Sequence, residues 1–222
     1  MSDIQHILKA HKRYKLHTLF SKTCQLVFLL TTAILITSCS QPKKLDILLA
    51  GSKILAFGDS LTYGTGADQG NAYPDALEKL TQLEVINAGI PGELSSEGLT
   101  RLPKLLAKHQ PELLILCHGG NDILRKNSPQ QLKENLIAMI ELAQQHNTQV
   151  VLIGVPQLKV FGGVHPVYQQ VAEQYNLPFE SEALSSLLKS NQYKSDMVHL
   201  NNAGYQQFAE YIHQLLQQEG AI

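Results

Sequence analysis

Short apolar runs alternate with helical patterns along most of the chain, and this alternation restricts the fold more than any other feature. From Lys53 onward, each apolar run is followed by a stretch in which apolar side chains recur at helical spacing. Such alternation is typical of a parallel β-sheet whose strands are joined by crossover helices. It predicts an α/β fold, a three-layer α/β/α sandwich around a five-stranded parallel sheet, with strands at residues 53–57, 84–88, 112–117, 149–154 and about 178–179.

The helices between these strands have recognisable start signals. Pro74 and Pro129 suit a first helical turn, and Ser128 stands at the N-cap position before Pro129. Either Ser95 or Ser96 can cap the helix that follows the second strand. We expect helices at residues 73–82, 95–109, 128–147, 166–176, 182–189 and 203–218.

Polar residues and glycines gather where the predicted strands end. Because the carboxyl ends of parallel strands meet at one edge of the sheet, where open α/β folds bind ligands, we expect these loops to lie together. They are Gly58-Asp59-Ser60 after the first strand, Asn87-Ala88-Gly89-Ile90-Pro91-Gly92 after the second, His118-Gly119-Gly120-Asn121-Asp122 after the third, and Asp196-Met197-Val198-His199 before the last helix.

These residue types can together perform acyl transfer. The Ser60 hydroxyl needs a base to become a nucleophile, and the His199 imidazole can accept its proton and return it to a leaving group. Asp196 can hold the other ring nitrogen and fix the tautomer. The backbone N–H groups of Ser60 and Gly89 and the side-chain amide of Asn121 are candidate donors to the oxyanion. Each residue alone also fits an ordinary turn or helix cap, so only the combination indicates catalysis.

The combined pattern resembles the SGNH (GDSL-type) hydrolases over about residues 53–217. Four blocks carry the resemblance, in the order found in that family: Gly-Asp-Ser-Leu at 58–61, Gly89, Gly-Gly-Asn-Asp at 119–122 and Asp-x-x-His at 196–199. The chain is most similar to the bacterial thioesterase I, lysophospholipase and arylesterase group, through residues 96–103 and 109–111.

The resemblance implies a flavodoxin-like SGNH hydrolase fold and a role for each block. It makes Ser60 the nucleophile, His199 the base and Asp196 its orienting partner. It places the oxyanion hole at Ser60, Gly89 and Asn121, and it implies neither a metal nor an organic cofactor. Two positions differ from the usual family pattern, Leu200 after the histidine and His118 before the Gly-Gly-Asn-Asp block.

The expected reaction is hydrolysis of carboxylic esters or acyl thioesters, such as lysophospholipids or short-to-medium acyl esters, through an acyl-serine intermediate. The loop at 155–166 is apolar enough to line an acyl pocket, and Val155, Leu158, Phe161 and His165 are its candidate residues. One alternative is a carbohydrate or peptidoglycan O-acetylesterase on the same site. A more distant alternative is a lipid-binding lipoprotein without catalytic activity.

The N-terminal segment has the pattern of an export signal. Residues 1–22 are basic, and residues 26–36 are uncharged and largely apolar but too short to span a bilayer. Ile36-Thr37-Ser38-Cys39 resembles the lipobox of bacterial lipoproteins. We therefore expect a lipoprotein signal peptide at 1–38, lipidation of Cys39, a tether at 39–52 and the hydrolase domain at 53–222.

These features predict a protein of the bacterial cell envelope, bound to a membrane by its lipid anchor. Ser40 after the cysteine suggests the outer membrane facing the periplasm. A cleaved signal, giving a periplasmic protein, or an uncleaved anchor remains open.

Composition narrows the possible partners. The net charge is −1, and five of the 18 Lys and Arg but only one of the 19 Asp and Glu lie in residues 1–38. The rest of the chain is therefore mildly acidic, which argues against nucleic-acid binding. The three cysteines offer neither a disulfide framework nor a zinc cluster. We expect a small-molecule or lipid ester substrate and a monomer.

Overall fold

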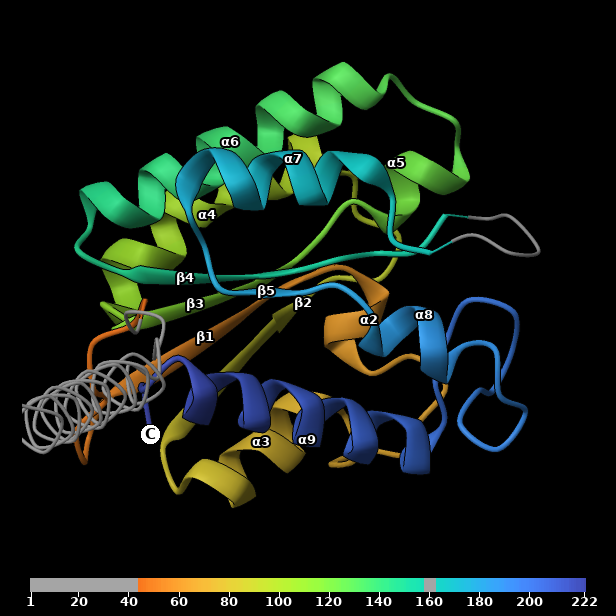
Figure 1. The fold of residues 1–222 in the computed structure, drawn as a ribbon, viewed down its shortest axis with the longest axis horizontal. Helices are drawn as coiled ribbons and strands as arrows, with labels where there is room; N and C mark the ends of the chain where they lie inside the picture. Colours follow the sequence, from red (N-terminus) through yellow and green to blue (C-terminus); the bar gives the residue numbers. More distant parts are fainter. Residues whose placement is uncertain (1–43, 158–162) are drawn as a thin grey trace, which may run out of the picture. The chain divides into compact units, whose positions relative to one another are not determined.

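The sheet has the predicted five strands, and they run parallel to one another as predicted. The computed structural model describes residues 44–157 and 163–222. All strand pairs in the sheet are parallel, and the strand order is β2-β1-β3-β4-β5, the flavodoxin-like order (Figure 1). The strands are β1 (Lys53–Gly58), β2 (Glu84–Gly89), β3 (Leu113–Cys117), β4 (Gln149–Ile153) and β5 (Phe179–Glu180).

Helices cover both faces of the sheet, which confirms the three-layer architecture. In Figure 1, α4, α6 and α7 lie on one side of the strands and α3 and α9 on the other. The six predicted helices are all present, as α3 (Tyr73–Thr81), α4 (Ser95–His109), α6 (Pro129–Gln145), α7 (Pro166–Tyr175), α8 (Ala183–Leu187) and α9 (Asn202–Gln218).

The central strands form the core of the domain. Every side chain from Ile54 to Phe57 and from Leu113 to Cys117 is inaccessible to solvent. Continuous apolar runs are needed here because helices pack on both faces of these strands. Cys117 is one of these buried residues, and burial raises the pKa of its thiol well above the ordinary value.

Two short helices follow directly from the ends of central strands and were not predicted. α2 (Ser60–Tyr63) begins two residues after β1, and α5 (Gly120–Leu124) begins three residues after β3. Helices of this length contain too few residues to show an apolar repeat, so their sequences resemble plain loops. Both begin at the carboxyl-terminal edge of the sheet, where the polar and glycine-rich loops were expected.

Helix capping is partly as predicted. The Ser128 hydroxyl accepts from the Gln131 N–H at 3.4 Å and caps α6. The expectation that Ser95 or Ser96 caps α4 is wrong, because Leu94 is the N-cap and the Glu97 carboxylate accepts the Leu94 N–H at 2.8 Å. The hydroxyl of Ser95 is buried and serves a longer-range contact instead.

The domain begins before the expected boundary at residue 53. Leu45 and Leu48 are buried in the core, and the Leu48 N–H donates to the Ala221 carbonyl at 2.7 Å. The compact unit starts at Lys43, so residues 44–52 belong to it rather than to a free tether. The expected signal peptide and Cys39 lie outside the described residues. Within the described part of the chain, no helix is long and apolar enough to cross a bilayer.

Candidate active site

The Ser60 side chain is presented at the N-terminus of α2, immediately beyond β1. Asp59 is the N-cap, and its carboxylate accepts the Leu61 N–H at 3.2 Å. Gly58 allows the close packing that this sharp turn requires, because a Cβ there would lie 2.0 Å from the Cys117 carbonyl oxygen. Each residue of the Gly-Asp-Ser sequence therefore has its own role. The glycine permits the close packing, the aspartate caps α2, and the half-buried serine presents its hydroxyl at the edge of the sheet.

The structure brings Ser60, His199 and Asp196 into one hydrogen-bonded line. His199 Nε2 lies 3.0 Å from Ser60 Oγ, although the two residues are 139 positions apart in the chain. His199 Nδ1 lies 2.8 Å from Asp196 Oδ2. The arrangement fits a neutral imidazole that carries its proton on Nδ1 and leaves Nε2 free to accept the serine proton.

The local conformation of the 196–199 loop fixes the carboxylate. Asp196 Oδ1 accepts the N–H groups of Val198 and His199, each at 2.8 Å. Partial burial works to raise the pKa of Asp196, but the hydrogen bonds from the His199 ring and these two amides outweigh it and lower the pKa. The group is therefore anionic at neutral pH and can stabilise a positive charge on the ring.

Asn121 lies at the start of α5, beside the same serine. Its side-chain amide donates to the Glu93 carbonyl at 3.0 Å and lies 3.5 Å from Asp59 Oδ2. Asp59 also accepts the Gly120 N–H at 3.1 Å, so one carboxylate joins the loops after β1 and β3. Burial raises the pKa of Asp59, while the charge of His118 and the amide donors Leu61 and Gly120 act against that rise.

The structure does not bring the Gly89 N–H to this site. Gly89 is the last residue of β2, its N–H donates to Asn87 Oδ1 at 3.0 Å, and a Cβ there would lie 2.1 Å from the Tyr63 nitrogen. Gly89 therefore provides close packing of β2 against α2. The prediction chose the glycine nearest the strand end, and β2 extends far enough to keep that residue in the sheet.

Gly92, three residues later in the same loop, was not chosen as an oxyanion donor from the sequence. It lines the same cavity as Ser60 and Asn121 and has a φ of 81°, a conformation that favours glycine. Within the described residues, no acceptor takes the N–H of Gly92 or of Ser60. The signal that could have found it is the second glycine of Gly89-Ile90-Pro91-Gly92.

A cavity of about 660 Å³ opens over Ser60 and His199. Its apolar lining includes Leu61, Ile123, Leu124, Val155, Leu188 and Met197. Two cationic residues, Lys189 and Lys194, also line it. A cavity of this size and lining can hold a small molecule with an apolar chain.

The predicted pocket residues divide into three groups. Val155 lines the cavity. Leu158 and Phe161 lie outside the described residues. His165 is instead the N-cap of α7, where its Nδ1 accepts the Val167 N–H at 3.4 Å, and it lines a separate hollow with Asp122 and Lys126.

The described ranges 44–157 and 163–222 contain no group of three His, Cys, Asp or Glu residues that could hold a metal ion.

Several bacterial proteins are similar to this chain in sequence. The chain is 36% identical over 128 residues to the esterase TesA of Pseudomonas aeruginosa, a match that spans 55% of this chain and 64% of that protein. It is 29% identical over 176 residues to thioesterase 1/protease 1/lysophospholipase L1 of Escherichia coli, spanning 76% of this chain and 85% of the relative. An arylesterase of Vibrio mimicus is 38% identical over 109 residues, 47% of this chain and 54% of that protein.

Solved structures share the fold at a similar level of identity. A crystal structure of TesA superposes with a TM-score of 0.68 at 28% identity, and the match covers 76% of this chain and 99% of that chain. AlinE4, described as an SGNH-hydrolase family esterase, superposes with a TM-score of 0.61 at 28% identity and covers 79% of this chain and 100% of that chain. The sequence profile of the GDSL-like lipase/acylhydrolase family matches residues 56–207, and this chain belongs to that family.

Proposed function

We propose that this chain is a serine hydrolase that cleaves carboxylic esters or acyl thioesters through an acyl-Ser60 intermediate. The observation that carries the proposal is the hydrogen-bonded line from Ser60 Oγ through His199 to Asp196, at 3.0 and 2.8 Å, at the base of an apolar cavity. Family membership and the names of the relatives, which include esterase, thioesterase, lysophospholipase and arylesterase, support the same reaction class.

The geometry performs the reaction in two half-steps. His199 Nε2 accepts the Ser60 proton as Oγ bonds to the acyl carbon, and the carbonyl oxygen becomes an oxyanion. The imidazolium then gives that proton to the departing alcohol or thiol as the bond to the acyl carbon breaks. In the second half-step His199 takes a proton from water, the hydroxyl attacks the acyl carbon, and Ser60 leaves with its proton restored.

The oxyanion donors in this proposal are the N–H groups of Ser60 and Gly92 and the side-chain amide of Asn121. All three residues line the cavity around Ser60. Gly92 replaces Gly89 in this role because the Gly89 N–H is engaged with Asn87. Backbone donors are held by the main chain and need little reorganisation when charge develops.

Replacing Asn121 by alanine is expected to lower kcat by about 10²- to 10³-fold, the usual cost of losing one oxyanion donor. KM should change little, because the donor acts on the charge of the transition state. Steady-state kinetics on a soluble ester measure both parameters. Asn127→Ala is the matched control, since Asn127 lies outside the cavity around Ser60. A kcat within threefold of wild type in Asn121→Ala would remove this residue from the oxyanion site.

The cavity supports a substrate with an acyl chain longer than acetyl. Its volume of about 660 Å³ and its apolar lining are far more than an acetyl group requires. We therefore favour lysophospholipids or medium-chain acyl esters over the O-acetylesterase alternative. The non-catalytic alternative does not account for the alignment of Ser60, His199 and Asp196.

The test of this function is hydrolysis of p-nitrophenyl esters with acyl chains from C2 to C12 by residues 43–222, together with mass spectrometry after treatment with an alkyl fluorophosphonate. We expect hydrolysis that peaks beyond C2 and a single phosphonyl adduct on Ser60. A sharp preference for C2 would favour the O-acetylesterase. Absence of both hydrolysis and adduct would favour the lipid-binding protein.

We also propose that the chain is anchored to a membrane through lipidation of Cys39. The lipobox-like Ile36-Thr37-Ser38-Cys39 supports lipidation of Cys39, and Ser40 after it supports attachment to the outer membrane. A relative in Bacillus subtilis, 29% identical over 130 residues that span 52% of this chain and 53% of that protein, is named as the uncharacterised lipoprotein YqeF. Several acyl chains on one cysteine would hold a domain stably at a bilayer.

Replacing Cys39 by alanine is expected to move the full-length protein from the detergent phase to the aqueous phase in Triton X-114 partitioning of cell extracts. The reason is that acyl chains on residue 39 would supply the membrane affinity. Cys24→Ala is the matched control and should leave the distribution unchanged. Equal partitioning of wild type and Cys39→Ala would argue against lipidation.

A further inference from the structure

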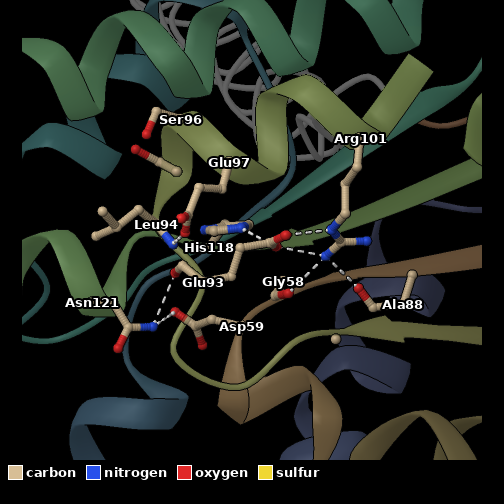
Figure 2. A network of polar contacts seen from close by, with 12 residues as sticks. Gly58, Asp59, Ala88, Glu93, Leu94, Ser96, Glu97, Arg101, His118 and Asn121 are labelled. Atoms are coloured by element: carbon tan, nitrogen blue, oxygen red, sulfur yellow. Dashed lines mark hydrogen bonds and ion pairs between the residues drawn. The ribbon is translucent and has the colours of Figure 1, made fainter. Parts of the chain in front are cut away.

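Glu93, the residue after Gly92, forms a largely buried cluster with Arg101 and His118 (Figure 2). The Glu93 carboxylate forms a bidentate ion pair with Arg101 of α4. Its Oε1 lies 2.6 Å from Arg101 Nε, and its Oε2 lies 2.7 Å from Arg101 Nη2. The same Oε2 lies 2.9 Å from Nε2 of His118. The Glu93 side chain is 6% exposed and the His118 side chain is inaccessible.

The cluster joins the ends of two strands. Arg101 Nη2 also donates to the carbonyls of Ala88 at 2.8 Å and Gly58 at 3.2 Å, and its guanidinium lies 4.1 Å from the centre of the Phe57 ring. Gly58 is the last residue of β1, two positions before Ser60. Arg101 therefore fixes the position of Glu93 relative to the backbone that presents the serine.

Glu93 connects this cluster to the proposed oxyanion donors through its main chain. Its carbonyl accepts the Asn121 amide at 3.0 Å, which sets the orientation of that side chain (Figure 2). Gly92, whose N–H has no acceptor among the described residues, is its immediate neighbour in the chain. A shift of Glu93 would therefore move both Gly92 and Asn121.

Stability alone gives a weak reason for such a cluster. Buried ion pairs are often no more stabilising than well-packed apolar residues of the same volume. Burial works to raise the pKa of Glu93, but the hydrogen bonds from His118 and Arg101 outweigh it and lower the pKa, so the carboxylate is anionic. The site is also shaped for His118, because a Cβ on Gly98 would lie 2.4 Å from its Nε2.

We propose that Glu93, Arg101 and His118 are positioning residues that hold the Gly92 N–H and the Asn121 amide in the geometry that binds the oxyanion. The inference rests on the proposed serine hydrolase function. Misplacement of a catalytic group by about 1 Å costs on the order of 10²-fold in rate. None of the three residues lines the cavity, so a side-chain change in this cluster should act on kcat.

The first test compares Glu93→Gln and Arg101→Lys with wild type on a p-nitrophenyl ester. Glutamine turns one acceptor oxygen into a donor that faces Arg101 or His118, and lysine keeps the charge but loses the two-pronged geometry. We expect kcat to fall about 10- to 100-fold in each variant while KM stays within threefold. Glu84→Gln, which alters an exposed ion pair with Lys53, is the matched control and should keep the wild-type kcat.

The second test combines each change with Asn121→Ala, with rates expressed per Ser60 labelled by fluorophosphonate so that misfolded protein is not counted. If the cluster acts through the oxyanion donors, its effect should shrink to a few-fold in the Asn121→Ala background. An unchanged kcat in both single variants, or full additivity in the double variants, would overturn the inference. If Glu93→Gln does not fold, Arg101→Lys decides it. An inactive wild type with no label on Ser60 would instead contradict the proposed function.

Discussion

Ser60→Ala is expected to lower kcat for ester hydrolysis by about 10⁴- to 10⁶-fold while the fold stays intact. In known Ser-His-Asp sites the nucleophile and its base act as one unit, so loss of either removes nearly all of their joint contribution. The change deletes one half-buried oxygen and leaves the Ser60 N–H in place. Residual activity should come from the oxyanion donors and from substrate binding.

The measurement is pre-steady-state and steady-state kinetics on a p-nitrophenyl ester, with thermal unfolding as the test of the fold. The control is Ser185→Ala. Ser185 lines the same cavity, and its buried hydroxyl has no hydrogen-bond partner among the described residues, so alanine should leave both kcat and stability near wild type. A Ser60→Ala variant that retains more than about 1% of wild-type kcat would show that another group is the nucleophile.

The sheet could be predicted from sequence because its signals are local. Runs such as Ile54–Phe57 and Leu113–Cys117 are apolar at every position, and the helices between strands show a clear apolar repeat. Once the strands are parallel, chain topology alone places their following loops on one edge. That is why Ser60 and Asn121, far apart in sequence, could be assigned to one site. His199 follows the short helix α8 rather than a strand, and it was assigned to the site through the Asp-x-x-His pattern and the need of Ser60 for a base.

The detailed contacts could not be predicted, because each depends on where another chain segment lies. Ser95 fits a helix cap by composition, yet its hydroxyl donates to Asp122 Oδ1 at 2.8 Å and accepts from Asn135, and Leu94 is the N-cap instead. Gly89 and Gly92 are equally suitable glycines in sequence. Only the extension of β2 through Gly89 decides which of them reaches the cavity.

The charged cluster shows the same limit in another way. His118 departs from the usual family pattern, and sequence alone gives no reason for it. In the folded chain its Nε2 contacts the same Glu93 carboxylate oxygen, Oε2, that accepts from Arg101 Nη2. Pairings across 25 positions leave no periodic signal, so the relation between His118, Glu93 and Asn121 appears only when the loops after β2 and β3 are seen together.

The second large effect is expected from Asp196→Asn, which should lower kcat by about 10⁴-fold with little change in size or shape. Asp196 Oδ1 accepts two backbone N–H groups, so the asparagine oxygen must take that position. The new NH₂ group then faces His199 Nδ1 and can only donate to it. The ring must carry its proton on Nε2, pointing at Ser60 Oγ, and in that tautomer it cannot accept the serine proton.

The effect is measured by kcat for ester hydrolysis and, independently, by the rate at which a fluorophosphonate labels Ser60. Both reactions require the transfer of the Ser60 proton to His199. We expect both rates to fall in parallel and KM to stay near wild type. Asp68→Asn makes the same chemical change at an exposed carboxylate that accepts from Asn202, and it should leave both rates unaltered. If Asp196→Asn kept its kcat within tenfold of wild type, the ring orientation would have to come from the loop backbone rather than from the carboxylate, and His199 would then act without an orienting partner.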